Sequence, residues 1–94
     1  MTTIQNRLIK MTAVGDTYKP RAIMHQVRFV GKGLTIGDLL QVVDNNNDIY
    51  TEHYVVNTVE DIPVLGTGVK LFSNGLKIAS MPGGGQCEVQ FHLL

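Results

Sequence analysis

Apolar and polar residues alternate along the stretch 86–94. A period of two is typical of a strand that has one face on a core and the other in water. The preceding stretch 75–80 has the same period, with Leu76 and Ile78 on one face. A proline and three glycines lie between the two stretches, in 81–85, and these residues favour a chain reversal. We therefore predict a β-hairpin made of 75–80 and 86–94.

The same alternation predicts further strands along the chain. They are expected at Ile4–Val14, Arg21–Val30, Thr35–Val43, Ile49–Val56 and Val69–Ser73. The polar turn Asp44–Asp48 makes a second hairpin of 39–56, because Asn and Asp tolerate the left-handed region and bond to their own backbone. Asn74–Gly75 is a further hairpin signal. The stretch 57–68 is predicted to be a loop, with a short edge strand at Ile62–Leu65 and at most a helical turn.

No segment shows sustained helical periodicity, so the predicted fold class is all-β. The 94 residues are expected to form a single domain, residues 1–94. Its predicted architecture is a small antiparallel β-sandwich or flattened barrel of about seven strands. Residues 1–14 alternate imperfectly, and they fit an edge strand or an arm that reaches a neighbour as well as a core strand.

The strand Arg21–Val30 has two predicted faces. The first holds Ile23, His25, Val27 and Phe29, and the second holds Met24, Gln26 and Arg28. The histidine on the apolar face is expected to be a hydrogen-bonded imidazole of the core or of an interface.

Composition limits the environment of the chain. There is one cysteine and no tryptophan, so no disulfide can form within the chain, and a reducing compartment is favoured. Residues 1–10 lack the pattern of a signal peptide. No apolar run approaches the roughly 18 residues of a membrane helix. We therefore expect a soluble protein made in the cytoplasm, not secreted and without a membrane partner.

Charge is unevenly spread although the net charge is zero. Residues 1–32 hold six basic residues against one acidic residue, a formal charge of +5. Residues 33–94 hold two basic residues against seven acidic ones, a formal charge of −5. The favoured interpretation is pairing between neighbouring strands of one sheet; the alternative is contact between subunits that sets their orientation. The basic residues are scattered and lack interleaved aromatics, so no nucleic-acid partner is expected.

The turn 44–48 invites comparison with a calcium loop. Asp44, Asn46 and Asp48 match the first three ligand positions of such a loop. However, Ile49 stands where glycine is needed, and Val55 stands where a bidentate glutamate is needed. We therefore predict a polar turn and no calcium site.

Other candidates for chemistry are isolated in the sequence. His25, His53 and His92 lie on three strands without the spacing of a zinc site, so no metal is predicted. Cys87 is expected to be a buried, inert thiol, because reactive cysteines need exposure and a nearby positive charge. Glu60–Asp61 is expected to be a solvated charge pair in a loop. Phosphate-loop and nucleophile motifs are missing, so we expect no enzyme and no cofactor.

Several segments follow the pattern of a known group of proteins. They are Asn6–Ile9 with Gly15–Asp16, Arg21–Ile23 leading to Phe29–Gly31, Gly37–Leu40 with the turn 44–48, and Gly75–Ile78. In these segments the chain resembles small all-β structural proteins of tailed bacteriophage virions. It departs from their pattern at 57–70, so no binding surface is carried over from them.

The resemblance implies a non-enzymatic structural component of a virion. The first expectation is a head decoration or cement protein that binds the capsid lattice or self-associates; a small neck or tail component is the alternative. Expected partners are the major capsid protein, another virion protein or a second copy of the chain. The expected location is the virion, after synthesis in the host cytoplasm.

A monomeric module that binds carbohydrate or another ligand is the hypothesis from a different class. Such modules present exposed aromatic side chains, and Tyr50 with Tyr54 is the candidate pair. The residues predicted at a partner surface are basic, aromatic or flexible side chains of the expected strands. They are Arg7, Lys10, Met24, His25, Arg28, Tyr50 and Tyr54.

Overall fold

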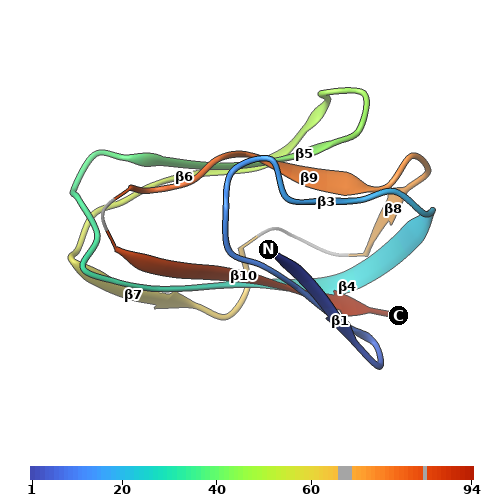
Figure 1. Cartoon of the computed structure of the whole chain (residues 1–94), viewed down its shortest axis with the longest axis horizontal. Helices are drawn as coiled ribbons and strands as arrows, with labels where there is room; N and C mark the ends of the chain where they lie inside the picture. Colours follow the sequence, from blue (N-terminus) through green and yellow to red (C-terminus); the bar gives the residue numbers. More distant parts are fainter. Residues whose placement is uncertain (66–68, 84) are drawn as a thin grey trace.

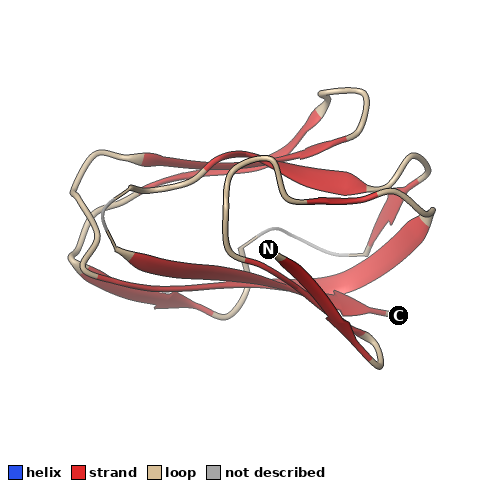
Figure 2. Ribbon diagram, in the orientation of Figure 1, coloured by secondary structure: helices blue, strands red, loops and turns tan. Residues whose placement is uncertain are grey.

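A computed structural model shows two antiparallel β-sheets that face each other (Figures 1 and 2). It describes residues 1–65, 69–83 and 85–94. The strands in these ranges are β1 (Thr2–Gln5), β2 (Leu8–Met11), β3 (Thr17–Tyr18), β4 (Ala22–Lys32), β5 (Leu39–Asp44), β6 (Ile49–Tyr54), β7 (Val59–Ile62), β8 (Lys70–Phe72), β9 (Leu76–Ser80) and β10 (Gln86–Leu93). The predicted all-β sandwich is confirmed. The described part holds more than seven strands because the N-terminal stretch forms two and β3 was not foreseen.

The two sheets differ in size. The larger one, sheet A, has the strand order β1-β2-β10-β4-β7, and β8 pairs with the first residues of β4. Sheet B has the order β3-β9-β5-β6 and lies above sheet A in Figure 1. The core between them contains the fully buried rings of Phe29, Phe72 and Phe91. Burial of each such side chain contributes roughly 1.5–3 kcal/mol, so this interior is the main source of stability.

The C-terminal strands β9 and β10 do not pair with each other, so the predicted hairpin is wrong. β9 pairs with β3 and β5 in sheet B, whereas β10 pairs with β2 and β4 in sheet A. Ser80, the last residue of β9, and Gln86, the first residue of β10, therefore belong to different sheets. Both strands bury their apolar faces, Ile78 on β9 and Phe91 on β10. Alternation reports a buried face, which opposite sheets of a sandwich supply as well as a hairpin does.

The turn at Asn74–Gly75 also connects the two sheets. It is a tight turn as predicted, with the Gly75 N–H donating to the Phe72 carbonyl at 3.3 Å. The expected hairpin is wrong, because β8 pairs with β4 in sheet A and β9 belongs to sheet B.

The N-terminal stretch folds back on itself and does not form one strand over 4–14. β1 and β2 pair around a two-residue loop, Asn6-Arg7. Asn6 has a φ of 56°, in the left-handed region that asparagine tolerates. The short β1 is the edge strand of sheet A, and β2 is an interior strand that buries Ile9 and Met11.

The predicted hairpin over 39–56 is confirmed by the pairing of β5 with β6. The segment Thr35–Asp38 is a turn and not the start of a strand, since the Asp38 N–H donates to the Thr35 carbonyl at 3.2 Å. The edge strand expected at Ile62–Leu65 lies earlier, as β7, because Pro63 has no N–H with which to continue a ladder. Residues 66–68 of the predicted loop lie outside the described residues.

A β-bulge at His25 inverts the predicted faces at the start of β4. Gln26 lies opposite His92 and Met24 lies opposite Leu93, so His25 is an extra residue in the ladder. Met24 is therefore buried, with 1% of its surface exposed, whereas Ile23 is 38% exposed. The predicted faces are correct for the residues that follow the bulge and inverted for the residues that precede it.

Candidate interaction surface

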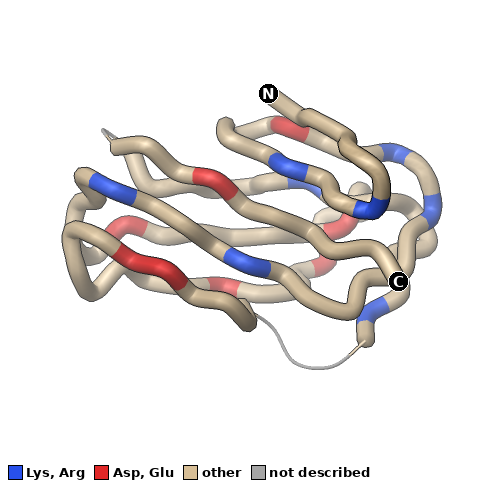
Figure 3. The backbone as a smooth tube through the Cα atoms, turned by 90° about the horizontal axis from the view of Figure 1, so that it is seen from below, with Lys and Arg blue, Asp and Glu red and all other residues tan. Residues whose placement is uncertain are grey.

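The outer face of sheet A gathers four of the predicted interface residues. Lys10 of β2 and Arg28 of β4 lie on either side of Gln90 of β10, because the register pairs each of them with Gln90. Arg7, in the β1–β2 loop, and His25, at the bulge, lie at one end of this face. Figure 3 shows basic and acidic positions interspersed on the strands of this sheet. The outer face of sheet A is thus a polar surface of mixed charge.

Two side-chain contacts order the middle of this surface. Arg28 and Asp61 form a two-pronged ion pair, with Nε donating to Oδ1 at 3.0 Å and Nη2 donating to Oδ2 at 2.6 Å. The hydrogen bond from Arg28 lowers the pKa of Asp61. Gln90 donates to the Glu88 carboxylate at 2.6 Å. The Arg28–Asp61 pair joins the basic N-terminal part to the acidic C-terminal part across neighbouring strands, as expected for pairing within one sheet.

Histidines and arginines line two shallow hollows at one end of sheet A. The first hollow has a volume of about 410 Å³ and contains Arg7, His25 and His92 in its wall. The two imidazole rings lie 6.0 Å apart between centroids. The second hollow, of about 340 Å³, is lined by Arg21 and Ile23 among others, and both hollows share Leu93. Arg7 and His25 in the first hollow and Arg21 in the second offer basic side chains to a partner, beside the apolar side chains of Ile23 and Leu93.

The remaining predicted interface residues do not join this surface. The prediction that Met24 lies at a partner surface is wrong, because the bulge turns its side chain into the core. Tyr50 packs edge-on against Phe72, with ring centroids 5.0 Å apart, and burial raises the pKa of its hydroxyl. Tyr54 is 59% exposed on sheet B. The exposed pair of Tyr50 with Tyr54 that a ligand-binding platform needs is therefore not formed.

A buried carboxylate that the sequence reasoning missed joins the two sheets. Glu60 was expected in a solvated loop, but it lies on β7 with 7% of its surface exposed. Its Oε1 accepts the N–H groups of Val56 and Asn57, at 2.8 and 3.1 Å, and its Oε2 lies 2.5 Å from Nε2 of His53. Burial alone would raise the pKa of Glu60, but these contacts outweigh it and hold the pKa below its usual value. Every acceptor of this side chain is satisfied, as in a structural clasp.

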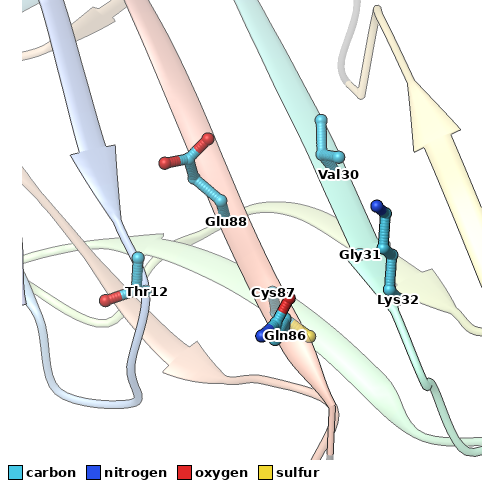
Figure 4. A pocket seen from close by; sticks show the side chains of 7 residues that line it. All are labelled: Thr12, Val30, Gly31, Lys32, Gln86, Cys87 and Glu88. Carbon is cyan, nitrogen blue, oxygen red and sulfur yellow. The ribbon is translucent and has the colours of Figure 1, made fainter.

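A groove at the other end of sheet A contains the cysteine (Figure 4). Its wall is formed by Gln86–Glu88 of β10, Val30–Lys32 of β4 and Thr12 beyond the end of β2. The groove has a volume of about 290 Å³. Cys87 is half-buried and its Sγ lies 3.6 Å from the Pro82 carbonyl oxygen, to which it donates. Burial, with a smaller contribution from Asp38, raises the pKa of the thiol. A thiol that stays protonated at neutral pH is a poor nucleophile.

The turn 44–48 is the polar turn that the sequence predicts. Oδ1 of Asp44 accepts the N–H groups of Asn46 and Asp48, at 2.8 and 3.0 Å. Asn47 takes a φ of 64° and its N–H donates to the Asp44 carbonyl oxygen at 3.0 Å. The carboxylate of Asp44 therefore holds the backbone of its own turn.

Within the ranges that the structure describes, no three His, Cys, Asp or Glu side chains are grouped so that they could hold a metal ion. The same ranges contain no helix that is long and apolar enough to cross a membrane. Comparison of the chain with protein-family models, curated proteins and solved structures finds no match.

Proposed function

We propose that this chain is a non-enzymatic structural component of a bacteriophage virion, a head decoration protein that binds the capsid lattice or a second copy of itself. One observation carries the proposal: Lys10 and Arg28 flank Gln90 on the outer face of sheet A, and Arg7 and His25 line one hollow at the end of this sheet. The resemblance to small all-β virion proteins is the reason for proposing a virion as the assembly. The outer face of sheet A is the surface proposed to contact the partner.

The outer face of sheet A is suited to contact with another protein. It lies on paired strands, so its side chains are held at fixed spacing and little order has to be gained on binding. Its charges of both signs favour one orientation of a partner over others. Half-exposed apolar side chains, Ile23 and Leu71, face each other across β4 and β8 at its basic end. Apolar contact beside fixed charges is the usual composition of a protein interface.

A neck or tail component would use the same outer face of sheet A for contact. Only the position of the chain in the virion distinguishes that alternative from a head protein. The ligand-binding alternative is less favoured, because Tyr50 packs on Phe72 and no aromatic ring among the described residues pairs with the exposed Tyr54.

Mass spectrometry of gradient-purified virions tests the proposal. Virions from the genome that encodes the chain are expected to contain it in many copies per particle, and immunogold labelling is expected over the head. Labelling at the neck or tail would support that alternative. Virions without the chain would contradict the proposal.

Charge reversal tests which surface makes the contact. Lys10→Glu on the outer face of sheet A is expected to lower the copy number per virion several-fold. Lys77→Glu is the matched control, because Lys77 lies on β9 of sheet B. Equal incorporation of the two variants would show that the outer face of sheet A is not the contact.

A further inference from the structure

The edge strand β1 differs from the other sheet edges of the described chain. Native proteins protect edge strands with charged side chains, prolines or very short length, because an unpaired edge can recruit another strand. β6 carries Glu52, β7 carries Glu60 and Asp61, and β8 carries Lys70. β3 has two residues and is followed by a lysine and a proline. β1 has the sequence Thr-Thr-Ile-Gln, with neither a charged side chain nor a proline.

The free backbone groups of β1 can be identified from the register. The Leu93 N–H donates to the Arg7 carbonyl, so Arg7, Ile9 and Met11 direct their backbone groups toward β10. Backbone direction alternates along an antiparallel strand, so Leu8 and Lys10 direct theirs toward β1. Their partners on β1 are Gln5 and Thr3. Thr2 and Ile4 therefore direct their N–H and C=O groups away from the sheet.

This arrangement is self-complementary. Thr2 and Ile4 lie symmetrically about Thr3. A second copy can therefore be placed antiparallel to the first across a two-fold axis at Thr3. In that arrangement Thr2 of each copy pairs with Ile4 of the other. Each pair exchanges two backbone hydrogen bonds. β1 has no charged side chain, and the Met1 ammonium that precedes it is paired with Asp16, so no like-charged side chains of β1 face each other at the new edge.

Side-chain burial also favours a second copy as the occupant of this edge. Ile4 faces the same side of the sheet as the buried Ile9, yet it is 58% exposed. In the two-fold arrangement the two Ile4 side chains are diagonal neighbours, at a spacing that aliphatic side chains can bridge. Strand addition would thus cover an exposed apolar side chain and satisfy four free backbone groups on each copy.

We propose that two copies of the chain associate through β1, in antiparallel register about Thr3, and extend sheet A across the dimer. The inference rests on the proposed assembly function and names its partner and its mode of contact. The paired strands are short, so the dimer is weak in solution and strengthened where copies are held side by side on a lattice.

Disulfide cross-linking tests the register. Thr3→Cys, in a Cys87→Ser background, places two thiols at the two-fold axis, where Cα atoms of such a pair are about 4.5 Å apart. Gln5→Cys in the same background is the control. Residue 5 lies two residues from the axis on each copy, so the two Cα atoms of this residue are roughly 14 Å apart, beyond the reach of a disulfide. Under mild oxidation the Thr3→Cys variant is expected to give at least tenfold more covalent dimer than the Gln5→Cys variant. Equal yields, or no dimer from either, would overturn the register.

Sedimentation velocity of Ile4→Pro tests the strand pairing itself. The Ile4 N–H points out of the sheet, so proline removes a donor to the second copy and none within the hairpin. The variant is expected to keep the far-ultraviolet circular dichroism of the parent chain and to weaken dimerisation at least tenfold. If it does not fold, Ile4→Lys serves in its place, with Val56→Lys as the control, since Val56 is 63% exposed on another part of the surface. A dimer that survives the change in β1 would overturn the proposal.

The two proposals can fail separately. Virions that contain the chain, together with a protein that stays monomeric at every concentration, would keep the proposed function and overturn the β1 dimer. A β1 dimer without incorporation into virions would do the reverse. Deletion of residues 1–12 is not a usable test, because it would also remove Ile9 and Met11 from the core.

Discussion

Glu60 and His53 form a hydrogen-bonded pair across the two sheets, with 2.5 Å between Oε2 and Nε2. Glu60 belongs to β7 of sheet A, and His53 belongs to β6 of sheet B. The same carboxylate accepts two backbone N–H groups of the segment that connects these strands. One side chain thus fixes the edges of both sheets and the loop between them.

This clasp predicts a loss of stability in acid. The folded-state pKa of Glu60 lies below its usual value of 4.5, so its ionised form stabilises the fold at any pH well above 4.5. That stabilisation is lost as the pH falls through the folded-state pKa. Urea unfolding followed from pH 7 to below about pH 3 should show this decline. Glu60→Gln should flatten part of it, and by more than Glu52→Gln, since Glu52 is exposed on β6.

Removal of the Glu60 side chain should destabilise the fold at neutral pH. Glu60→Ala leaves the N–H groups of Val56 and Asn57 and the His53 ring without their acceptor, at a cost of roughly 1–3 kcal/mol in the free energy of unfolding. Glu52→Ala is the control, since Glu52 is exposed on β6. A loss for Glu60→Ala no larger than that of the control would contradict the structural role.

Gly75 should resist substitution more strongly than Gly37. Both have positive φ, 76° and 95°, so alanine costs each about 1–2 kcal/mol in backbone conformation. At Gly75 a Cβ would also lie 1.9 Å from the Tyr18 carbonyl oxygen, whereas at Gly37 it would meet no atom within 4 Å. Gly75→Ala should therefore lower the urea midpoint clearly more than Gly37→Ala. Equal effects would argue against the close approach of the β8–β9 turn to Tyr18.

The bulge at His25 predicts that alanine substitutions at two adjacent residues of β4 lower the free energy of unfolding by different amounts. Met24→Ala opens a cavity in the core and should cost roughly 2–5 kcal/mol. Ile23→Ala trims a side chain that is 38% exposed and should cost less than about 1 kcal/mol. Unfolding free energies in the reverse order would restore the regular alternation that the sequence suggests.

The thiol of Cys87 should react slowly in the folded chain. Its raised pKa lowers the fraction of thiolate, and half-burial limits access to reagents. Alkylation by iodoacetamide near neutral pH should be about tenfold or more slower than in the urea-unfolded chain. Comparable rates in the two states would show a thiol that is exposed and ionised.

Sequence periodicity located strands better than it located their partners. β9 and β10 begin and end close to their predicted bounds, yet they belong to opposite sheets. The alternation of a strand is set by its own buried face and contains nothing about which strand lies beside it. By contrast, the hairpin of β5 and β6 could be predicted, because Asp44 and its asparagine neighbours specify a local turn.

The candidate surface was predictable only in part. Arg7, Lys10 and Arg28 lie on the outer face of sheet A because charged side chains avoid the core. The bulge at His25, which places Met24 inside, depends on the register with β10 and has no local signal. The pairing of Glu60 with His53 likewise depends on contact between two sheets. An acidic pair flanked by valine and isoleucine in 59–62 was the one hint that Glu60 lies on a strand.

Light scattering behind a sizing column, over a concentration series of the intact chain, tests most directly whether this protein assembles through β1. The mass should rise from 10.3 kDa at micromolar concentration toward twice that value at the highest concentration. The rise should be insensitive to salt, because β1 contributes backbone hydrogen bonds and Ile4 but no charge, and Ile4→Pro should abolish it. A mass that stays at 10.3 kDa throughout, with Ile4→Pro indistinguishable from the parent chain, would contradict the account.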